Sequence, residues 1–297
     1  MRAILSYSIC LLLLVYACRT GKETYVRAAK PSLVERVTFG QPNLPTISAH
    51  RGGRYYAGYP ENSIELFAYT AGKARAIIEC DVSMSKDSVL FLMHDWSLDR
   101  TTTGEGKVAE KNWADMKDLK LEDDFGTLTS YTIPTLDQTL SWAKNKVWLS
   151  LDIKRGVPFS MVVDAINTYN ASSYAAIITY NIDAAKEVYK LAPNVLISAG
   201  IRNIEDLKRY KESGIPMKNL IAFTGTKEPD PAVYKALHEE GIVCMLGTLG
   251  NLDKRVKAKG NDKLYENYVK KGADILATDR PLEAAKVLEN WRKQTRK

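Results

Sequence analysis

The stretch AAIITYNIDAAKEVYKL, residues 175–191, places an uninterrupted apolar run directly before a segment with helical spacing. Its first four residues are all apolar, without the alternation of a strand that has one side in water. From Ile182 onward, apolar residues recur three and four positions apart, as on the buried face of a helix. A buried strand followed by an amphipathic helix is the repeating unit of α/β folds with a parallel sheet.

The same unit recurs from Thr46 to the end of the chain without an obvious linker. Strands are predicted at 46–51, 76–82, 89–94, 147–153, 175–180, 195–201, 220–224, 242–247 and 274–278. Helices are predicted at 62–74, 135–145, 160–169, 182–191, 203–213, 230–240, 261–271 and 281–294. Because a (β/α)8 barrel has roughly 250 residues, we predict a single α/β domain over 46–297 with the TIM-type barrel architecture.

The predicted strands number one more than such a barrel needs. Two of them, both within 76–94, are joined by too few residues for a crossover helix, so they are predicted to form an antiparallel β-hairpin. If the hairpin turns at about residue 87, paired residues have numbers that sum to about 174, which places Asp81 near Met93. One strand of this hairpin, or the short strand 220–224, must then lie outside the barrel.

The composition excludes several classes of protein. A chain of 297 residues with 45% hydrophobic and 26% charged residues can form a full-sized core, so it is not a disordered chain. Its four cysteines include no C-x-x-C spacing, which argues against a disulfide scaffold or a closed zinc site. The formal charge of +7 is spread along the chain. This pattern favours an anionic substrate or membrane surface weakly, and we predict no nucleic-acid partner.

The first residues have the features of an export signal. Arg2 precedes an apolar run that is shorter than the about 20 residues a spanning helix requires. Ala17 directly before Cys18 resembles a bacterial lipoprotein box, with ordinary secretion and an uncleaved anchor as the alternatives. We therefore predict a lipoprotein-type signal peptide over 1–17 and a tether over 18–45. The mature protein is expected to be exported to the periplasm or cell envelope and attached to the membrane through lipidated Cys18.

Ionisable residues gather near the ends of the predicted strands, which a barrel brings to one active site. They are His50, Arg51, Glu79, Asp81, His94, Asp152 and Lys154. Glu79 and Asp81 are two apart on a strand and face the same side, where a cation would offset their repulsion. The hairpin places His94 diagonally beside them. Asp152 and Lys154 also share one face, which fits a salt-bridged pair as well as a functional one.

These residue types indicate metal-assisted cleavage of a phosphate ester. Carboxylates without thiolate or imidazole ligands select hard divalent cations such as Mg²⁺ or Ca²⁺. Arg51 and Lys154 supply positive charge for an anion, and a guanidinium can bind two phosphate oxygens at once. Two histidines can act as acid and base near neutral pH, although either one alone fits a structural hydrogen-bonding role as well.

Seven short motifs resemble those of the glycerophosphodiester phosphodiesterase family in order and spacing. They are HRG at 50–52, PENS at 60–63, IECDV at 78–82, HD at 94–95, RTTTG at 100–104, IPTL at 133–136 and ATDRP at 277–281. The resemblance covers about 46–285 and implies a metal-dependent barrel enzyme. Such an enzyme hydrolyses a small-molecule glycerophosphodiester to glycerol phosphate and an alcohol.

The resemblance also implies residue roles. It assigns the general acid and base to His50 and His94, the metal ligands to Glu79, Asp81 and Asp152, and the phosphate contacts to Arg51 and Lys154. Two alternatives stay open at this point. One is a phospholipase-type barrel enzyme that acts on intact lipid or forms a cyclic phosphate, and the other is a non-catalytic phosphodiester-binding protein.

Two departures from the family pattern concern the metal and the pocket. The family usually has glutamate where Asp152 stands, and a tryptophan-containing segment where this chain has CMLGTLGN at 244–251.

Asn62, within the PENS motif, has a structural interpretation. Asn62 precedes Glu65 by three positions, which predicts an N-terminal capping box, so Asn62 is expected to start a helix.

Overall fold

The computed structural model describes residues 30–41 and 44–295, so the predicted signal peptide and Cys18 lie outside the described residues. Eight parallel strands form a closed barrel in the order β1-β11-β10-β9-β8-β7-β6-β2, and pairing of β1 with β2 closes it. These strands are β1 (Ile47–Ala49), β2 (Ala76–Met84), β6 (Trp148–Ile153), β7 (Ala175–Thr179), β8 (Leu196–Gly200), β9 (Leu220–Phe223), β10 (Val243–Gly247) and β11 (Ile275–Thr278). The predicted TIM-type barrel is confirmed.

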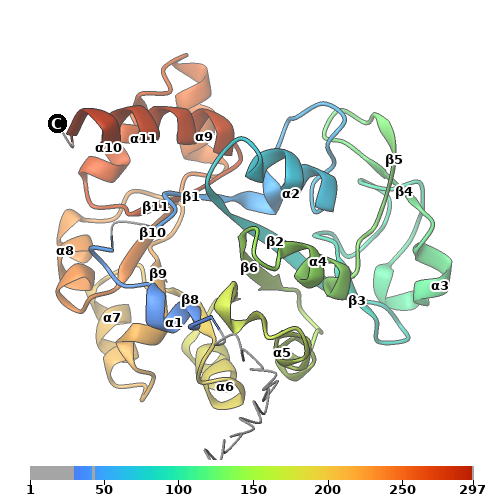
Figure 1. The fold of residues 1–297 in the computed structure, drawn as a ribbon, viewed down its shortest axis with the longest axis horizontal. Coiled ribbons are helices and arrows are strands. Elements are labelled where there is room, and N and C mark those ends of the chain that lie inside the picture. Colours follow the sequence, from blue (N-terminus) through green and yellow to red (C-terminus); the bar gives the residue numbers. More distant parts are fainter. Residues whose placement is uncertain (1–29, 42–43, 296–297) are drawn as a thin grey trace, which may run out of the picture. The chain divides into compact units, whose positions relative to one another are not determined.

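Helices surround the barrel (Figure 1). They are α2 (Ile64–Ala71), α4 (Leu136–Ala143), α5 (Phe159–Thr168), α6 (Ile182–Leu191), α7 (Ile204–Lys211), α8 (Pro231–Glu239), α9 (Asn251–Ala258), α10 (Leu264–Lys270) and α11 (Pro281–Thr295). Short 3₁₀ turns are η1 (His50–Gly52), η2 (Val108–Glu110), η3 (Ala171–Ser173) and η4 (Met217–Asn219). None of the helices in the described part of the chain is both long enough and apolar enough to cross a membrane.

The apolar run of β7 is buried on both faces, which explains its lack of alternation. Ala175 and Ile177 pack in the core that joins the barrel to its helices. Ala176 belongs to a second cluster, which also contains the buried residues Leu33 and Val34 of the short helix α1 (Leu33–Arg36). This helix precedes the predicted start of the barrel and packs against residues from several of its strands.

The hairpin supplies the ninth strand. β3 (Leu90–Leu92) pairs antiparallel with β2, and Val82 lies opposite Leu92. The amide of Met93 donates to the carbonyl of Asp81 at 3.0 Å, which confirms the predicted register. β3 is therefore the strand outside the barrel, whereas the segment predicted at 220–224 forms β9 between β8 and β10.

The chain between β3 and α4 forms an insertion with its own apolar cluster. It contains α3 (Trp113–Met116) and a two-stranded sheet of β4 (Lys120–Glu122) and β5 (Leu128–Thr132), drawn in green on one side of the barrel in Figure 1. Phe91, Leu98 and Met116 are fully buried in this cluster. His94 is the second residue of this insertion, which continues the chain directly from the hairpin.

Candidate active site

The turn after β1 directs the backbone of Arg51 at the acidic residues. Arg51 has a left-handed backbone with φ 54°, and its amide donates to Glu79 Oε2 at 2.7 Å. Gly52 follows with φ 89°, and a Cβ there would lie 2.5 Å from the Phe67 ring. Only glycine fits this conformation and this packing without displacement. The sequence His50-Arg51-Gly52 therefore sets the geometry of the turn.

Three carboxylates from two neighbouring strands meet at this end of the barrel. Glu79 and Asp81 extend from β2, and Asp152 extends from β6, where it pairs in register with Asp81. All three are buried, and one oxygen from each lies within 4.8 Å of the others. The predicted set of three acids is thus brought together, and its geometry is suited to one shared cation.

Positively charged side chains contact two of these carboxylates, Asp81 and Asp152. Lys154 Nζ lies 2.6 Å from Asp81 Oδ1 and 2.7 Å from Asp152 Oδ2. Arg51 Nε lies 3.6 Å from Asp81 Oδ2. The salt-bridged pair on one strand face is therefore present, and it also belongs to the acidic cluster. Lys154 is therefore both a salt-bridge partner of Asp152 and a neighbour of the acidic cluster, so the structural and the functional interpretations are compatible.

Asn62 does not begin the helix, contrary to the prediction. The N-cap of α2 is Ser63, whose side chain accepts from the Leu66 amide. Asn62 has a left-handed backbone with φ 58°, its side-chain amide donates to Asp81 Oδ2 at 2.7 Å, and its carbonyl accepts from the Asp81 amide at 3.0 Å. A capping pattern cannot distinguish two adjacent cap formers, and here the serine caps while the asparagine positions Asp81.

His50 is positioned by a residue whose role the sequence did not reveal. Its Nδ1 lies 2.7 Å from Asp279 Oδ1, and Asp279 follows directly after β11. Burial lowers the pKa of His50, but the Asp279 hydrogen bond and the nearby Glu79 charge outweigh burial and raise it overall. The position of Asp279 after a strand was the available signal, because β11 ends beside β1 in the barrel.

Replacing Asp279 with asparagine should lower the pKa of His50. Burial and Arg51 both favour the neutral ring, and the substitution removes a negative charge that opposes them. The measurement is an NMR titration of the ring protons in metal-free protein, where His94 and His238 serve as internal references. An unchanged or higher pKa of His50 in the folded variant would show that Asp279 does not control its protonation.

His94 is held by a separate network. Its Nδ1 lies 2.7 Å from Asp95 Oδ1, and Arg100 Nε donates to Asp95 Oδ2 at 2.6 Å. Arg100 also donates to Glu61 Oε1 at 2.7 Å, and Glu61 pairs in turn with Arg51 at 2.9 Å. The chain of contacts connects His94 to the turn after β1. It also shows that Glu61 pairs with two arginines, Arg51 and Arg100.

A cavity of about 230 Å³ opens beside the acids. His50, Glu79 and Asp152 line it together with apolar side chains from β7 to β11 and with Tyr180 and Arg202 from the loops after β7 and β8. His94 is not among the described residues that line this cavity. Tyr180 and Arg202 carried no sequence motif, and their place here follows only from the barrel's closure.

The electrostatics of the cluster favour a bound cation. Burial and the neighbouring Asp81 carboxylate raise the pKa of Glu79 to about 8. Burial would raise the pKa of Asp81 as well, but Lys154 and Arg51 outweigh it and lower that pKa. Asp152 Oδ1 is buried without a hydrogen-bond partner among the described residues. A buried carboxylate oxygen without a partner is costly, and a divalent cation would satisfy it.

Comparisons with known proteins identify relatives of this chain. The sequence profile of the glycerophosphoryl diester phosphodiesterase family matches residues 50–255. A crystal structure of a glycerophosphoryl diester phosphodiesterase from Parabacteroides distasonis superposes with a TM-score of 0.81 at 34% identity, covering 89% of this chain and 94% of that one.

Two curated relatives carry the name glycerophosphodiester phosphodiesterase. The relative from Caldanaerobacter subterraneus is 32% identical over 158 residues, which cover 51% of this chain and 64% of the relative. The alignment thus spans about two thirds of that protein. The relative from Bacillus altitudinis is 25% identical over 261 residues, which cover 84% of this chain and 100% of the relative. The chain therefore belongs to the glycerophosphoryl diester phosphodiesterase family of phosphoric diester hydrolases.

Proposed function

We propose that this protein hydrolyses glycerophosphodiesters to glycerol phosphate and an alcohol with the help of a divalent cation. The observation that carries the proposal is the cluster of Glu79, Asp81 and Asp152, of which Glu79 and Asp152 line one cavity together with His50. Family membership supplies the substrate class. The cluster supplies a reason for metal dependence, because three buried carboxylates need more positive charge than Lys154 and Arg51 provide.

Glu79, Asp81 and Asp152 would hold the cation, which we propose to be Mg²⁺ or Ca²⁺ because all three ligands are oxygens. When bound, the cation would neutralise the phosphate and make its phosphorus more electrophilic. Asn62 keeps Asp81 in place through both ends of its side-chain amide. This support orients one ligand before the cation arrives, as outer contacts do in metal sites.

Arg51 and Lys154 are proposed to contact the phosphate. Both positively charged side chains lie close to Asp81. Their positive charge therefore stands at the edge of the carboxylate cluster, where a phosphodiester anion would approach. Glu61 fixes the Arg51 guanidinium through a 2.9 Å ion pair, so this cation is oriented before substrate binds.

The two histidines are proposed to act as general acid and base. In each, Nδ1 faces a carboxylate at 2.7 Å, Asp279 for His50 and Asp95 for His94. A carboxylate at Nδ1 fixes the tautomer with its proton there, so Nε2 is the atom that exchanges protons with substrate. One histidine would take a proton from the attacking hydroxyl, and the other would give one to the leaving oxygen.

A panel of substrates tests the proposal. Purified protein is incubated with glycerophosphodiesters of different head groups and with intact phospholipids, and the phosphate products are identified by mass spectrometry. We expect glycerol phosphate from the glycerophosphodiesters. Hydrolysis of intact lipid alone would instead identify a phospholipase, a cyclic glycerol phosphate would make the 2-hydroxyl the nucleophile, and binding without turnover would identify a binding protein.

We also propose that the protein is a lipoprotein of the cell envelope. The support is in the sequence, where a short apolar run over residues 3–15 is followed by Ala17, a small residue directly before Cys18. Expressed in a bacterium with lipoprotein processing, the wild type should fractionate with membranes, whereas Cys18→Ser should lose the lipid. If mass spectrometry finds no acyl group on the N-terminus of the mature wild type, the anchor proposal is wrong.

A further inference from the structure

A second group of metal-ligating side chains lies at the opposite end of the strands. His238 is near the C-terminal end of α8, Cys244 is the second residue of β10, and Asp274 directly precedes β11. One ligand atom from each lies within 4.8 Å of the others. The amino-terminal ends of β10 and β11 carry this group, whereas Asp152 is the fifth of the six residues of β6 and pairs in register with Asp81 of β2.

The contacts within the group are short. His238 Nε2 lies 2.9 Å from Asp274 Oδ2, and the same oxygen accepts from the Cys244 amide at 2.7 Å. Cys244 is a free cysteine, fully buried, and its Sγ makes only a weak contact of 3.8 Å with the carbonyl of Ile242. The sulfur thus lies beside an imidazole and a carboxylate without a strong partner of its own in the described part of the chain.

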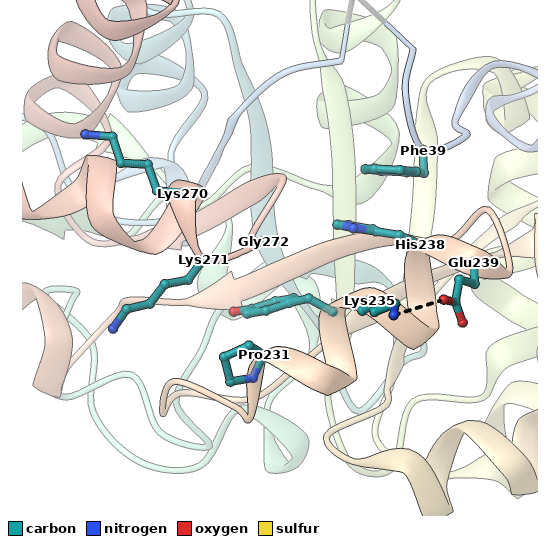
Figure 2. A pocket seen from close by; sticks show the side chains of 9 residues that line it. Phe39, Pro231, Lys235, His238, Glu239, Lys270, Lys271 and Gly272 are labelled. Carbon is teal, nitrogen blue, oxygen red and sulfur yellow. Dashed lines mark ion pairs between the residues drawn. The ribbon is translucent and has the colours of Figure 1, made fainter.

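Packing fixes the histidine ring. The Phe39 ring stacks on His238 with 3.7 Å between centroids and 9° between planes, and Figure 2 shows the two rings lying flat against each other. Cavities of about 450 Å³ and about 310 Å³ adjoin the ring, and His238 and Asp274 both line the smaller one. This smaller cavity would give an ion a route to His238 and Asp274 and would leave room for a water molecule as a further ligand.

We propose that His238, Cys244 and Asp274 bind a divalent transition metal such as Zn²⁺. Nitrogen, sulfur and oxygen ligands together suit zinc, and three protein ligands with one water complete a tetrahedral shell. From typical zinc–ligand lengths, the ligand atoms of such a shell lie about 3.3–3.8 Å apart. The group therefore needs only small side-chain rotations. The thiol proton passes to solvent when Sγ binds the metal.

The ligand chemistry separates this site from the catalytic one. Glu79, Asp81 and Asp152 offer only oxygen atoms and favour hard cations, whereas a thiolate favours zinc or cobalt. A metal here would join α8, β10 and the chain before β11. Through Phe39 it would also fix the segment that follows α1. We therefore assign the site a stabilising role, and its test does not depend on turnover.

Cobalt absorption tests the proposal directly, because thiolate ligation to Co²⁺ gives a near-ultraviolet charge-transfer band that carboxylates do not give. Metal-free full-length protein is titrated with Co²⁺ and then with Zn²⁺. The wild type should develop the band, and Zn²⁺ should remove it. Cys244→Ser should lose the band, while Cys80→Ser, which removes the other buried thiol of the described chain, should keep it.

A second variant covers the case in which Cys244→Ser does not fold. His238→Phe retains an aromatic ring against Phe39 and removes one ligand. Cobalt affinity should fall by at least about 10–100-fold, because this loss is typical even for residues that only hydrogen-bond to a metal ligand. No band in the wild type, a band that persists in Cys244→Ser, or an unchanged affinity in His238→Phe would each overturn the proposal.

Discussion

Replacing His50 with alanine is expected to lower turnover by about 10²–10⁴, the usual loss when a general acid or base is removed. His50 lines the cavity beside Glu79, and its Nδ1 lies 2.7 Å from Asp279 Oδ1. The same loss is expected for His94→Ala. Steady-state kinetics on each purified variant, with circular dichroism to confirm folding, give the measurement.

The chain offers a matched control for this experiment. His238 is its third histidine and lies outside the catalytic cavity. His238→Phe should therefore keep wild-type turnover when the catalytic cation is supplied. If a folded His50→Ala or His94→Ala variant turns over substrate as fast as this control, that histidine takes no part in the proton transfers.

The second large effect concerns Asp152, the one proposed ligand that is shorter than the residue usual in the family. Asp152→Asn should weaken metal binding and activity sharply, because it removes one of three negative charges and leaves Lys154 with Asp81 as its one carboxylate partner among the described residues. Asp152→Glu retains the charge and should keep substantial activity. Calorimetric titration of metal into chelated protein, combined with turnover, compares the two variants.

The pair of variants separates two roles of one side chain. If Asp152 only holds Lys154, asparagine should lower turnover but leave metal affinity at the wild-type value. If Asp152 is a ligand, its buried Oδ1, which has no partner among the described residues, is the atom that the cation satisfies. Wild-type metal affinity in Asp152→Asn would therefore remove Asp152 from the ligand set.

The barrel and the acidic cluster could be predicted because local patterns determine them. An apolar run buried on both faces, such as 175–179, is distinctive in sequence, and the two-residue period of a strand places Glu79 and Asp81 on one face. The hairpin register followed from its turn alone. Such features depend on residues close together in the chain, so the sequence carries them directly.

The insertion and the supporting contacts could not be predicted in this way. β4 and α3 have only three and four residues, too few for a period, and they are ordered by the cluster around Phe91 and Met116. Asp279 reaches His50 across 229 positions of sequence. Such a contact exists only because the barrel closes, so it becomes visible only in three dimensions.

The capping motif at Asn62 shows a different limit. Asn62 and Ser63 are both good N-caps, and the pattern with Glu65 favoured the first. Burial decided the outcome, because the Asp81 amide and carboxylate need a donor and an acceptor that an asparagine side chain provides together. Hydrogen bonding to the buried Asp81 therefore determined the position of Asn62, and its capping propensity did not.

The requirement for a divalent cation is tested by removing the metal and adding it back. Full-length protein is treated with a chelator, the chelator is removed, and hydrolysis of a glycerophosphodiester is followed as Mg²⁺ or Ca²⁺ is added back. We expect negligible turnover without metal and recovery with one of these ions, and we expect Asp152→Asn to require a far higher metal concentration. Full turnover in the metal-free protein would contradict it.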